Sequence, residues 1–212
     1  VTDVSGMFNN ALSFNGDISS WDVSSVTNMN SMFENAESFA GDLSNWDVSS
    51  VTNMREMFTG AISFQSDLSN WNVSNVTDML RMFKLSNYNG DLSSWDVSSV
   101  ENMQALFNTN PVFNGDLSDW NVLSLTNMRN MFINASSFNS NISSWDVSNV
   151  TNMSNAFQNA ESFNQNLSNW DISSVTVMEG VFNGQTALSD TNKCYMDDAF
   201  QSNAVWPYEW VG

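Results

Sequence analysis

Residues 14–38 read FNGDISSWDVSSVTNMNSMFENAES, and the pattern returns from residue 39 as FAGDLSNWDVSSVTNMREMFTGAIS. Copies continue along the chain, so that a tryptophan recurs every 25 residues, with one step of 24. These tryptophans are Trp21, Trp46, Trp71, Trp95, Trp120, Trp145 and Trp170. A fixed period of this length indicates a solenoid built by stacking one small unit, because no unit can bury its apolar face alone.

Further apolar columns run through the copies. One aromatic column opens the units: Phe14, Phe39, Phe64, Tyr88, Phe113, Phe138 and Phe163. A second column holds Phe8, Phe33, Phe58, Phe83, Phe107, Phe132, Phe157 and Phe182. The residue missing from the fourth unit falls between Phe83 and Asp91, in a polar stretch that is typical of a loop.

Two periods occur within each unit. Alternation at Trp21–Val23 predicts a short strand. Apolar residues over Val26–Ala36 are spaced by three, three, one and three, which predicts a short helix with Thr27 or Asn28 as its N-cap. Asn-Gly-Asp at 15–17 predicts a turn. Each unit is therefore expected to be strand, bend, short helix and turn, with parallel strands about 4.8 Å apart.

The domain division follows from these repeats. Residues 1–182 are expected to form about seven 25-residue repeats, with a half-repeat at 1–13, and residues 183–212 to form a C-terminal cap. Trp206, Tyr208 and Trp210 crowd that end, where large aromatic rings cover an exposed core slice well. A partner-docking tail is the alternative. Residues 1–8 align with 26–33, so we expect a mature or truncated piece of a longer chain.

Composition restricts the partners. The net charge is −18, with 5 basic residues and no histidine, so the surface repels nucleic acid and anionic lipid and favours cations or basic partners. The apolar runs are shorter than the roughly 20 residues of a spanning helix, so no direct membrane insertion is expected. Cys194 is the sole cysteine, which leaves no internal disulfide.

The segment Ile18-Ser-Ser-Trp-Asp-Val-Ser-Ser-Val26 resembles the leucine-rich-repeat spacing L-x-x-L-x-L-x-x-N, with valine in place of the usual asparagine. The fuller motif W-D-V-S-x-V-T-N-M-x-x-M-F, followed by S-F-N-x-D-L, resembles the BspA-like leucine-rich-repeat surface proteins. The resemblance implies an α/β fold, a right-handed leucine-rich-repeat-like solenoid with short parallel strands on one face and short helices on the other. It also implies an extracellular or cell-surface location, adhesion or binding, and no enzyme activity.

Because Val26 replaces the usual asparagine, the buried asparagine ladder of that family is missing from its usual place. The column headed by Asn28 is expected to take over part of the role. Its members are Asn28, Asn53, Asp78, Asn102, Asn127 and Asn152.

The candidate binding face follows from the geometry of the resembled family, in which residues flanking the buried strand positions point outward on the concave sheet. We call the resulting set the acidic strip, and we expect it to bind cations, sugars or a basic partner, unless it is simply a solvated surface. Its members are Asp22, Asp47, Asn72, Asp96, Asn121, Asp146 and Asp171, flanked by Ser24, Ser49, Ser74, Ser98, Ser148 and Ser173.

A second acidic column runs Asp17, Asp42, Asp67, Asp91, Asp116, Asn141 and Asn166. Turn chemistry, in which aspartate binds nearby backbone amides, is its simplest explanation. Carboxylates and hydroxyls could hold calcium, but their linear spacing does not enclose an ion, so we expect weak divalent-cation binding at most and no cofactor.

The chain offers little for catalysis. Without histidine and with one cysteine, zinc or iron sites lack ligands, and the serines lack a base. A glycosidase would need a carboxylate pair, but the pairs here repeat in every unit. The 13 methionines mostly follow the repeat and are expected to fill the core. Seven N-x-S/T sequons are candidate glycosylation acceptors: Asn72, Asn75, Asn134, Asn141, Asn149, Asn152 and Asn166.

The sequence therefore predicts a non-catalytic surface or secreted repeat protein that recognises a protein or glycan ligand through the acidic strip. The alternative is a structural filament or surface-layer component that self-associates end to end through the solenoid ends.

Overall fold

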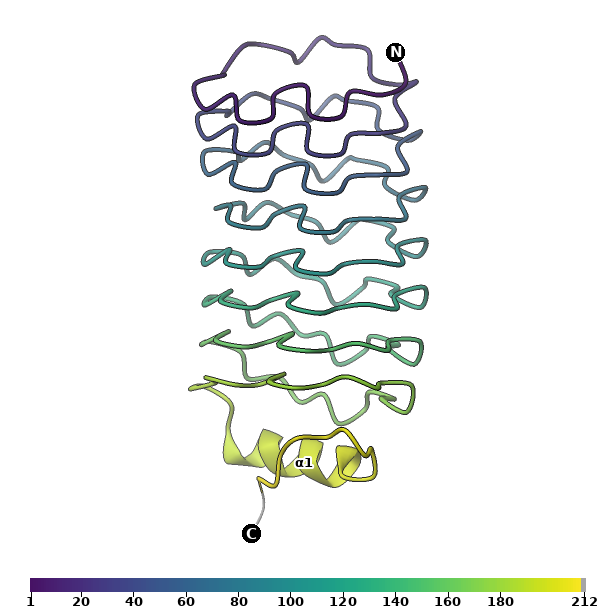
Figure 1. Cartoon of the computed structure of the whole chain (residues 1–212), viewed down its shortest axis with the longest axis vertical. Coiled ribbons are helices and arrows are strands. Elements are labelled where there is room, and N and C mark those ends of the chain that lie inside the picture. Colours follow the sequence, from purple (N-terminus) through teal and green to yellow (C-terminus); the bar gives the residue numbers. More distant parts are fainter. Residues whose placement is uncertain (211–212) are drawn as a thin grey trace.

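A computed structural model describes residues 1–210. The repeats form coils stacked along one long axis, and the helix α1, Asp190–Phe200, closes the C-terminal end (Figure 1). The predicted repeat solenoid is confirmed. Over residues 1–210, α1 is the only α-helix and no extended strand forms, so the strand and helix predicted for each unit are wrong.

The segment predicted as a helix is a ribbon of turns that bonds to the next coil. The backbone amides of Met29, Ser31 and Phe33 donate to carbonyls of the following coil over 3.0, 2.8 and 2.9 Å. An α-helix would instead direct each amide to the carbonyl four residues earlier. Parallel bridges join the coils through the Asn28 column, so the predicted parallel pairing exists here rather than at the tryptophans.

Left-handed backbone makes this ribbon possible. In each coil two positions, four residues apart, have positive φ, as at Ser31 (54°) and Asn35 (56°). The second of these columns contains Asn10, Asn35, Gly60, Leu85, Thr109, Asn134, Asn159 and Gly184. Asparagine and glycine tolerate this region best, and they fill six of the eight places. Thr27 and Asn28 therefore cap no helix, and Asn28 instead accepts from the Asn30 amide over 3.1 Å.

The segment predicted as a strand lies between two turns. The Trp21 amide donates to the Ile18 carbonyl over 3.1 Å, and the Val26 amide to the Val23 carbonyl over 2.8 Å. Each of these bonds joins an amide to the carbonyl three residues earlier in the same coil, as in a β-turn. The backbone at Trp21–Val23 does not pair with neighbouring coils as a sheet would. The predicted concave sheet is consequently wrong, although the side chains at Trp46 and Val48 are buried as predicted.

Three aromatic columns run through a core that also contains columns of valine, leucine and methionine. Phe33 stacks on Phe58 of the next coil with ring centroids 5.6 Å apart, and on Phe39 of its own coil at 4.2 Å. The tryptophans hold neighbouring coils together by a buried bond: the indole of Trp120 donates to the Leu92 carbonyl of the preceding coil over 2.9 Å. The same bond recurs from Trp46, Trp71, Trp95, Trp145 and Trp170.

The shortened fourth unit leaves these columns intact. Phe83 stacks on Phe58 across 25 residues of chain, whereas Tyr88 stacks on Phe64 across 24. The missing residue therefore lies between Phe83 and Tyr88, within the interval that the sequence predicted.

The C-terminal segment packs on the last coil. Ser189 caps α1 by accepting from the Asn192 amide. Trp206, Tyr208 and Trp210 lie with ring centroids 5.6–6.3 Å from Phe182. The Tyr208 hydroxyl accepts from the Phe182 amide over 2.9 Å, where another coil would supply a carbonyl. Residues 211–212 of the predicted cap lie outside the described range.

Among the described residues, no helix has the length and apolar character needed to cross a membrane.

Candidate functional site

All seven Asp/Asn members of the acidic strip are exposed, as predicted, but they are positioned by turns rather than by a strand. Asp22 shows the arrangement: one carboxylate oxygen accepts from the Ser24 amide over 3.1 Å and from the Ser24 hydroxyl over 2.6 Å. Asn72 makes the same two bonds with Ser74. The flanking serines therefore orient the carboxylates, and part of their own hydrogen-bonding capacity is already used within the coil.

The second acidic column has the same local geometry. Asp17 accepts from the Ser19 amide over 3.0 Å and from the Ser19 hydroxyl over 2.7 Å. The turn role predicted for this column describes both columns, since each aspartate starts a turn closed by a serine two residues later. Each coil thus presents two acidic or amide turns side by side in sequence, at Asp17–Ser19 and Asp22–Ser24.

These hydrogen bonds keep the strip charged. The Ser49 side chain and amide hold the pKa of Asp47 below its ordinary value, against the opposing effects of desolvation and of the Asp22 charge. The Ser148 hydroxyl and amide lower the pKa of Asp146 in the same way. Hydrogen bonds to a carboxylate stabilise its ionised form. The strip therefore remains anionic to lower pH than free aspartates would.

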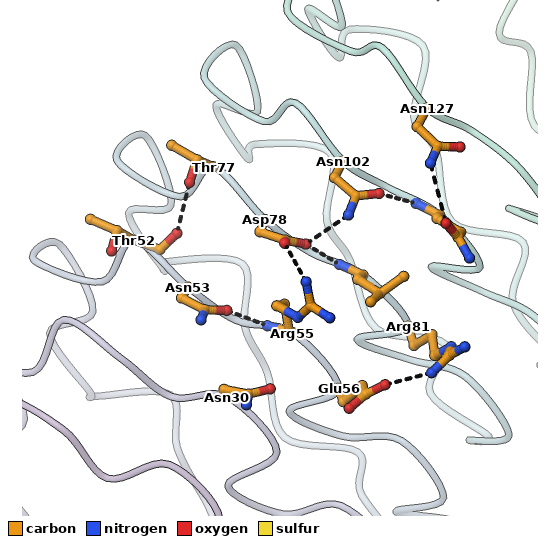
Figure 2. Close-up of polar contacts among 12 residues, drawn as sticks. Asn30, Thr52, Asn53, Arg55, Glu56, Thr77, Asp78, Arg81, Asn102 and Asn127 are labelled. Carbon is orange, nitrogen blue, oxygen red and sulfur yellow. Dashed lines mark hydrogen bonds and ion pairs between the residues drawn. The ribbon is translucent and has the colours of Figure 1, made fainter. Parts of the chain in front are cut away.

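Positive charge is confined to another part of the coil. No lysine or arginine occurs in residues 14–26 or in the equivalent segment of the six later coils. In the turn ribbon, by contrast, Arg55 pairs with Asp78 over 3.0 Å and Arg81 with Glu56 over 2.7 Å, as Figure 2 shows. Both pairs join neighbouring coils. The coil is therefore polarised, with an acidic side that has no cation of its own.

The polar groups of the ribbon mostly serve the stacking of coils. Threonine hydroxyls bond the preceding coil, as from Thr77 to the Thr52 carbonyl over 3.3 Å (Figure 2). In the Asn28 column, Asn28 donates to Asp3 over 3.0 Å and Asn102 to Asp78 over 3.2 Å. This column makes some of the inter-coil bonds expected of it.

A second asparagine column with a structural role was not predicted from the sequence. Asn89 accepts from the amide of Asn114, Asn114 from that of Asn139, and Asn139 from that of Asn164, over 2.7–2.9 Å. Asn164 then accepts from the Ser189 amide over 2.9 Å, which ties the C-terminal segment to the array. Asparagine directly after the opening aromatic was the signal, visible in Phe113-Asn114 and Phe138-Asn139.

Metal ligands do not gather in the described part of the chain. Within residues 1–210, no three of the side chains that commonly bind metal ions lie close enough to hold one. The two acidic columns supply carboxylates in rows, and the local serine bonds occupy part of each group. Weak binding of divalent cations along the strip stays a prediction.

The sequon asparagines differ in whether the side-chain amide nitrogen already donates a hydrogen bond. Asn75 donates to the Ser49 carbonyl over 2.8 Å and Asn149 to the Leu123 carbonyl over 2.9 Å, so a glycan on either nitrogen would disturb a bond between coils. Asn72 and Asn141 are exposed and use their carbonyl oxygens as acceptors. These two acceptors fit the surface best.

Tyr88 is an unusual buried group. It stands in the phenylalanine column with no exposed surface, and its hydroxyl has no hydrogen-bond partner among the described residues. Burial, followed by the charge of Asp67, raises its pKa; the nearby Leu68 amide acts in the opposite direction without reaching hydrogen-bond geometry. A Cβ on Gly90 would collide with this hydroxyl, so a side chain there would force the Tyr88 ring to move.

The coils and columns described above define a repeat solenoid with an aromatic ladder. The chain belongs to the family described as Mycoplasma protein of unknown function, DUF285, which matches residues 1–90 and 81–195. It is similar to a leucine-rich repeat protein from Bacteroides ovatus ATCC 8483 in a crystal structure, with 12% identity and a TM-score of 0.41. That match covers 89% of this chain and 54% of the other, so this chain spans about half of its length. No curated protein matches.

Proposed function

We propose that this chain is a non-catalytic recognition module of a cell-surface or secreted protein, and that it binds a basic partner through the acidic strip. The observation that carries the proposal is the polarised coil. Five aspartates in each of the two acidic columns, ten of the 23 acidic residues, lie in segments that contain no lysine or arginine. A surface of one charge sign attracts partners of the opposite sign and accelerates their association.

The hydrogen bonds of the strip support the same function. Because Ser24 and its equivalents hold the carboxylates in one orientation, less side-chain freedom is lost when a partner binds. We also propose that the chain is similar to the BspA-like surface proteins, that its coil is right-handed and that the protein is extracellular. The absence of catalysis is also part of the proposal, since nearly the same groups recur in every coil.

The protein supplies its own matched substitutions for a test. Asn72 and Asn121 already occupy the strip and accept the same amide bond as the aspartates, each over 3.2 Å. A triple change of Asp47, Asp96 and Asp146 to asparagine should therefore remove three charges without disturbing the turns. We expect weaker binding to immobilised basic proteins at physiological salt. The comparison is the same triple change at Asp42, Asp67 and Asp116, which removes the same charge from the second column and should weaken binding less.

The refuting result is equally direct. If the first triple variant kept full binding to every ligand bound by the unsubstituted protein, the acidic strip would not be the recognition face. Binding to an immobilised panel of neutral glycans that survives both triple changes would point to another surface.

End-to-end assembly into a filament or surface layer is the alternative proposal. It receives less support, because Trp206, Tyr208 and Trp210 already cover the ring of Phe182 in the last coil. Assembly through that end would require the covering segment to move. Light scattering at rising concentration distinguishes the two functions, since a strict monomer contradicts assembly.

A further inference from the structure

The acidic strip ends at a cleft beside its last coil. The cleft lies between the last coil and the C-terminal segment and has a volume of about 500 Å³. Trp170, Asp171 and Ile172 line it on the coil side, and Ala199, Asn203 and Val205 line it on the other. Asp171 is the last carboxylate of the strip, so the strip and the cleft form one continuous surface.

The cleft exists because the C-terminal segment does not replace a complete coil. In the array, each tryptophan indole donates to a carbonyl of the preceding coil, as from Trp170 to Ile142 over 3.0 Å. The next tryptophan along the chain, Trp206, instead donates to Asp197 over 2.7 Å. Asn203 makes a different contact with the last coil, donating to the Ile172 carbonyl over 2.7 Å.

The apolar residues on the coil side are slightly more exposed than their equivalents one coil earlier. Trp170 and Ile172 are each 6% exposed, whereas their equivalents one coil earlier, Trp145 and Val147, are 3% and 1% exposed. The small side chain of Ala199 opposite them leaves the apolar edges accessible. The cleft therefore offers an apolar wall next to one carboxylate, Asp171, whose orientation is fixed by the Ser173 amide over 2.9 Å.

We propose, resting on the function proposed above, that this cleft is the anchor site for a lysine or arginine side chain of the basic protein partner. Such side chains combine an aliphatic stem with a cationic head, which fits an apolar wall beside a carboxylate. The charge of the surroundings excludes an acidic anchor, because the net charge is −18 and the neighbouring strip member is Asp146. Asp171 takes the head, and the edges of Trp170 and Ile172 take the stem.

An anchor also solves a problem of register. The strip repeats nearly the same group once per coil, so a basic partner could shift by one coil with little change in energy. A smaller apolar pocket of about 250 Å³ lies beside Asp22 at the N-terminal end of the strip, whereas the cleft of about 500 Å³ lies beside Asp171 at the C-terminal end. A side chain seated there gives the partner one position along the axis, and most of the binding energy of an interface comes from a few such buried anchors.

The test uses the full chain and a fluorescent octalysine peptide as the probe, with binding followed by anisotropy at low salt. Ala199→Trp and Ser202→Trp fill the cleft from positions that are exposed, and Asp171→Asn removes its charge. We expect each to weaken binding about tenfold, as loss of an anchor does. Thr191→Trp, an exposed position of α1 outside the cleft, is the matched control and should bind as the unsubstituted protein does.

Amide chemical shifts of the unsubstituted protein give a second reading that does not depend on any variant. Shifts concentrated at residues 171–176 and 199–205 support the anchor. Even shifts along the strip, with Ala199→Trp binding normally, overturn the anchor but leave the strip as the recognition face. Equal binding of fully acetylated octalysine or of a neutral glycan in the cleft overturns the cationic assignment. Failure of octalysine to bind at all overturns both proposals.

Discussion

The bond from each tryptophan to the preceding coil can be tested by comparing two residues of one column. Trp120 is 3% exposed and donates to the Leu92 carbonyl over 2.9 Å. Trp21 is 39% exposed, and no hydrogen bond from its indole is found within residues 1–210. Replacing each by phenylalanine removes the same atoms from two different environments.

The expected difference follows from these environments. Trp120→Phe loses a net hydrogen bond, about 1 kcal/mol, and the burial of part of a ring, roughly 1 kcal/mol. A loss of about 2 kcal/mol lowers the Tm of a chain of this size by about 4–8 °C. Trp21→Phe should cost under about 0.5 kcal/mol, as surface substitutions do, and should lower the Tm by less than about 2 °C.

Thermal unfolding followed by circular dichroism measures both variants, and urea unfolding checks that the transition stays cooperative. Equal Tm shifts for the two variants would refute the reasoning, because they would show that the inter-coil indole bond contributes nothing. A broader transition for Trp120→Phe alone would indicate that weakening an interior coil uncouples the array into two parts.

Four further predictions follow from the other contacts. Tyr88→Phe should raise the free energy of unfolding by about 1 kcal/mol, because it removes a buried hydroxyl without a partner; a measured loss of stability in urea would contradict this. The strip aspartates have lowered pKa values, so their contribution to stability should persist from neutral pH down to about pH 4 and disappear as pH falls through the folded values. Ser24→Ala should raise the pKa of Asp22 in an NMR titration, and an unchanged titration would show that the hydroxyl has no effect. Salt should raise the Tm by screening the two acidic columns, with calcium adding little beyond its ionic strength; identical melting curves at low and high salt would contradict this.

The repeat, its core and the exposed side of each coil were predictable, because burial alone determines the spacing of apolar residues. Trp46, Phe58 and Phe64 recur at the intervals that stacking requires, and all three are buried. The position of the acidic strip followed from the same pattern, since Asp47 lies between two buried residues, Trp46 and Val48.

The local backbone was not predictable from that spacing. In a helix, Val26, Met29, Phe33 and Ala36 would lie on one face. The ribbon of successive turns that the structure has instead also directs these four side chains inward. The signal that distinguishes the two was the column headed by Asn10, where asparagine and glycine recur at left-handed positions. The cleft beside Asp171 could not be predicted either, because it depends on how the unrepeated segment packs.

The inter-coil bonds also determine how the molecule would respond to force. The amides of Met29, Ser31 and Phe33 bond to the next coil along the chain, so each coil is held chiefly by its two neighbours. Tension applied through the two ends would act on one boundary between coils at a time. The coils would therefore unfold one after another. Each coil released would add 25 residues of chain, up to roughly 85 Å of extended length. The array would thus act as an extensible tether that lengthens in equal steps before it breaks.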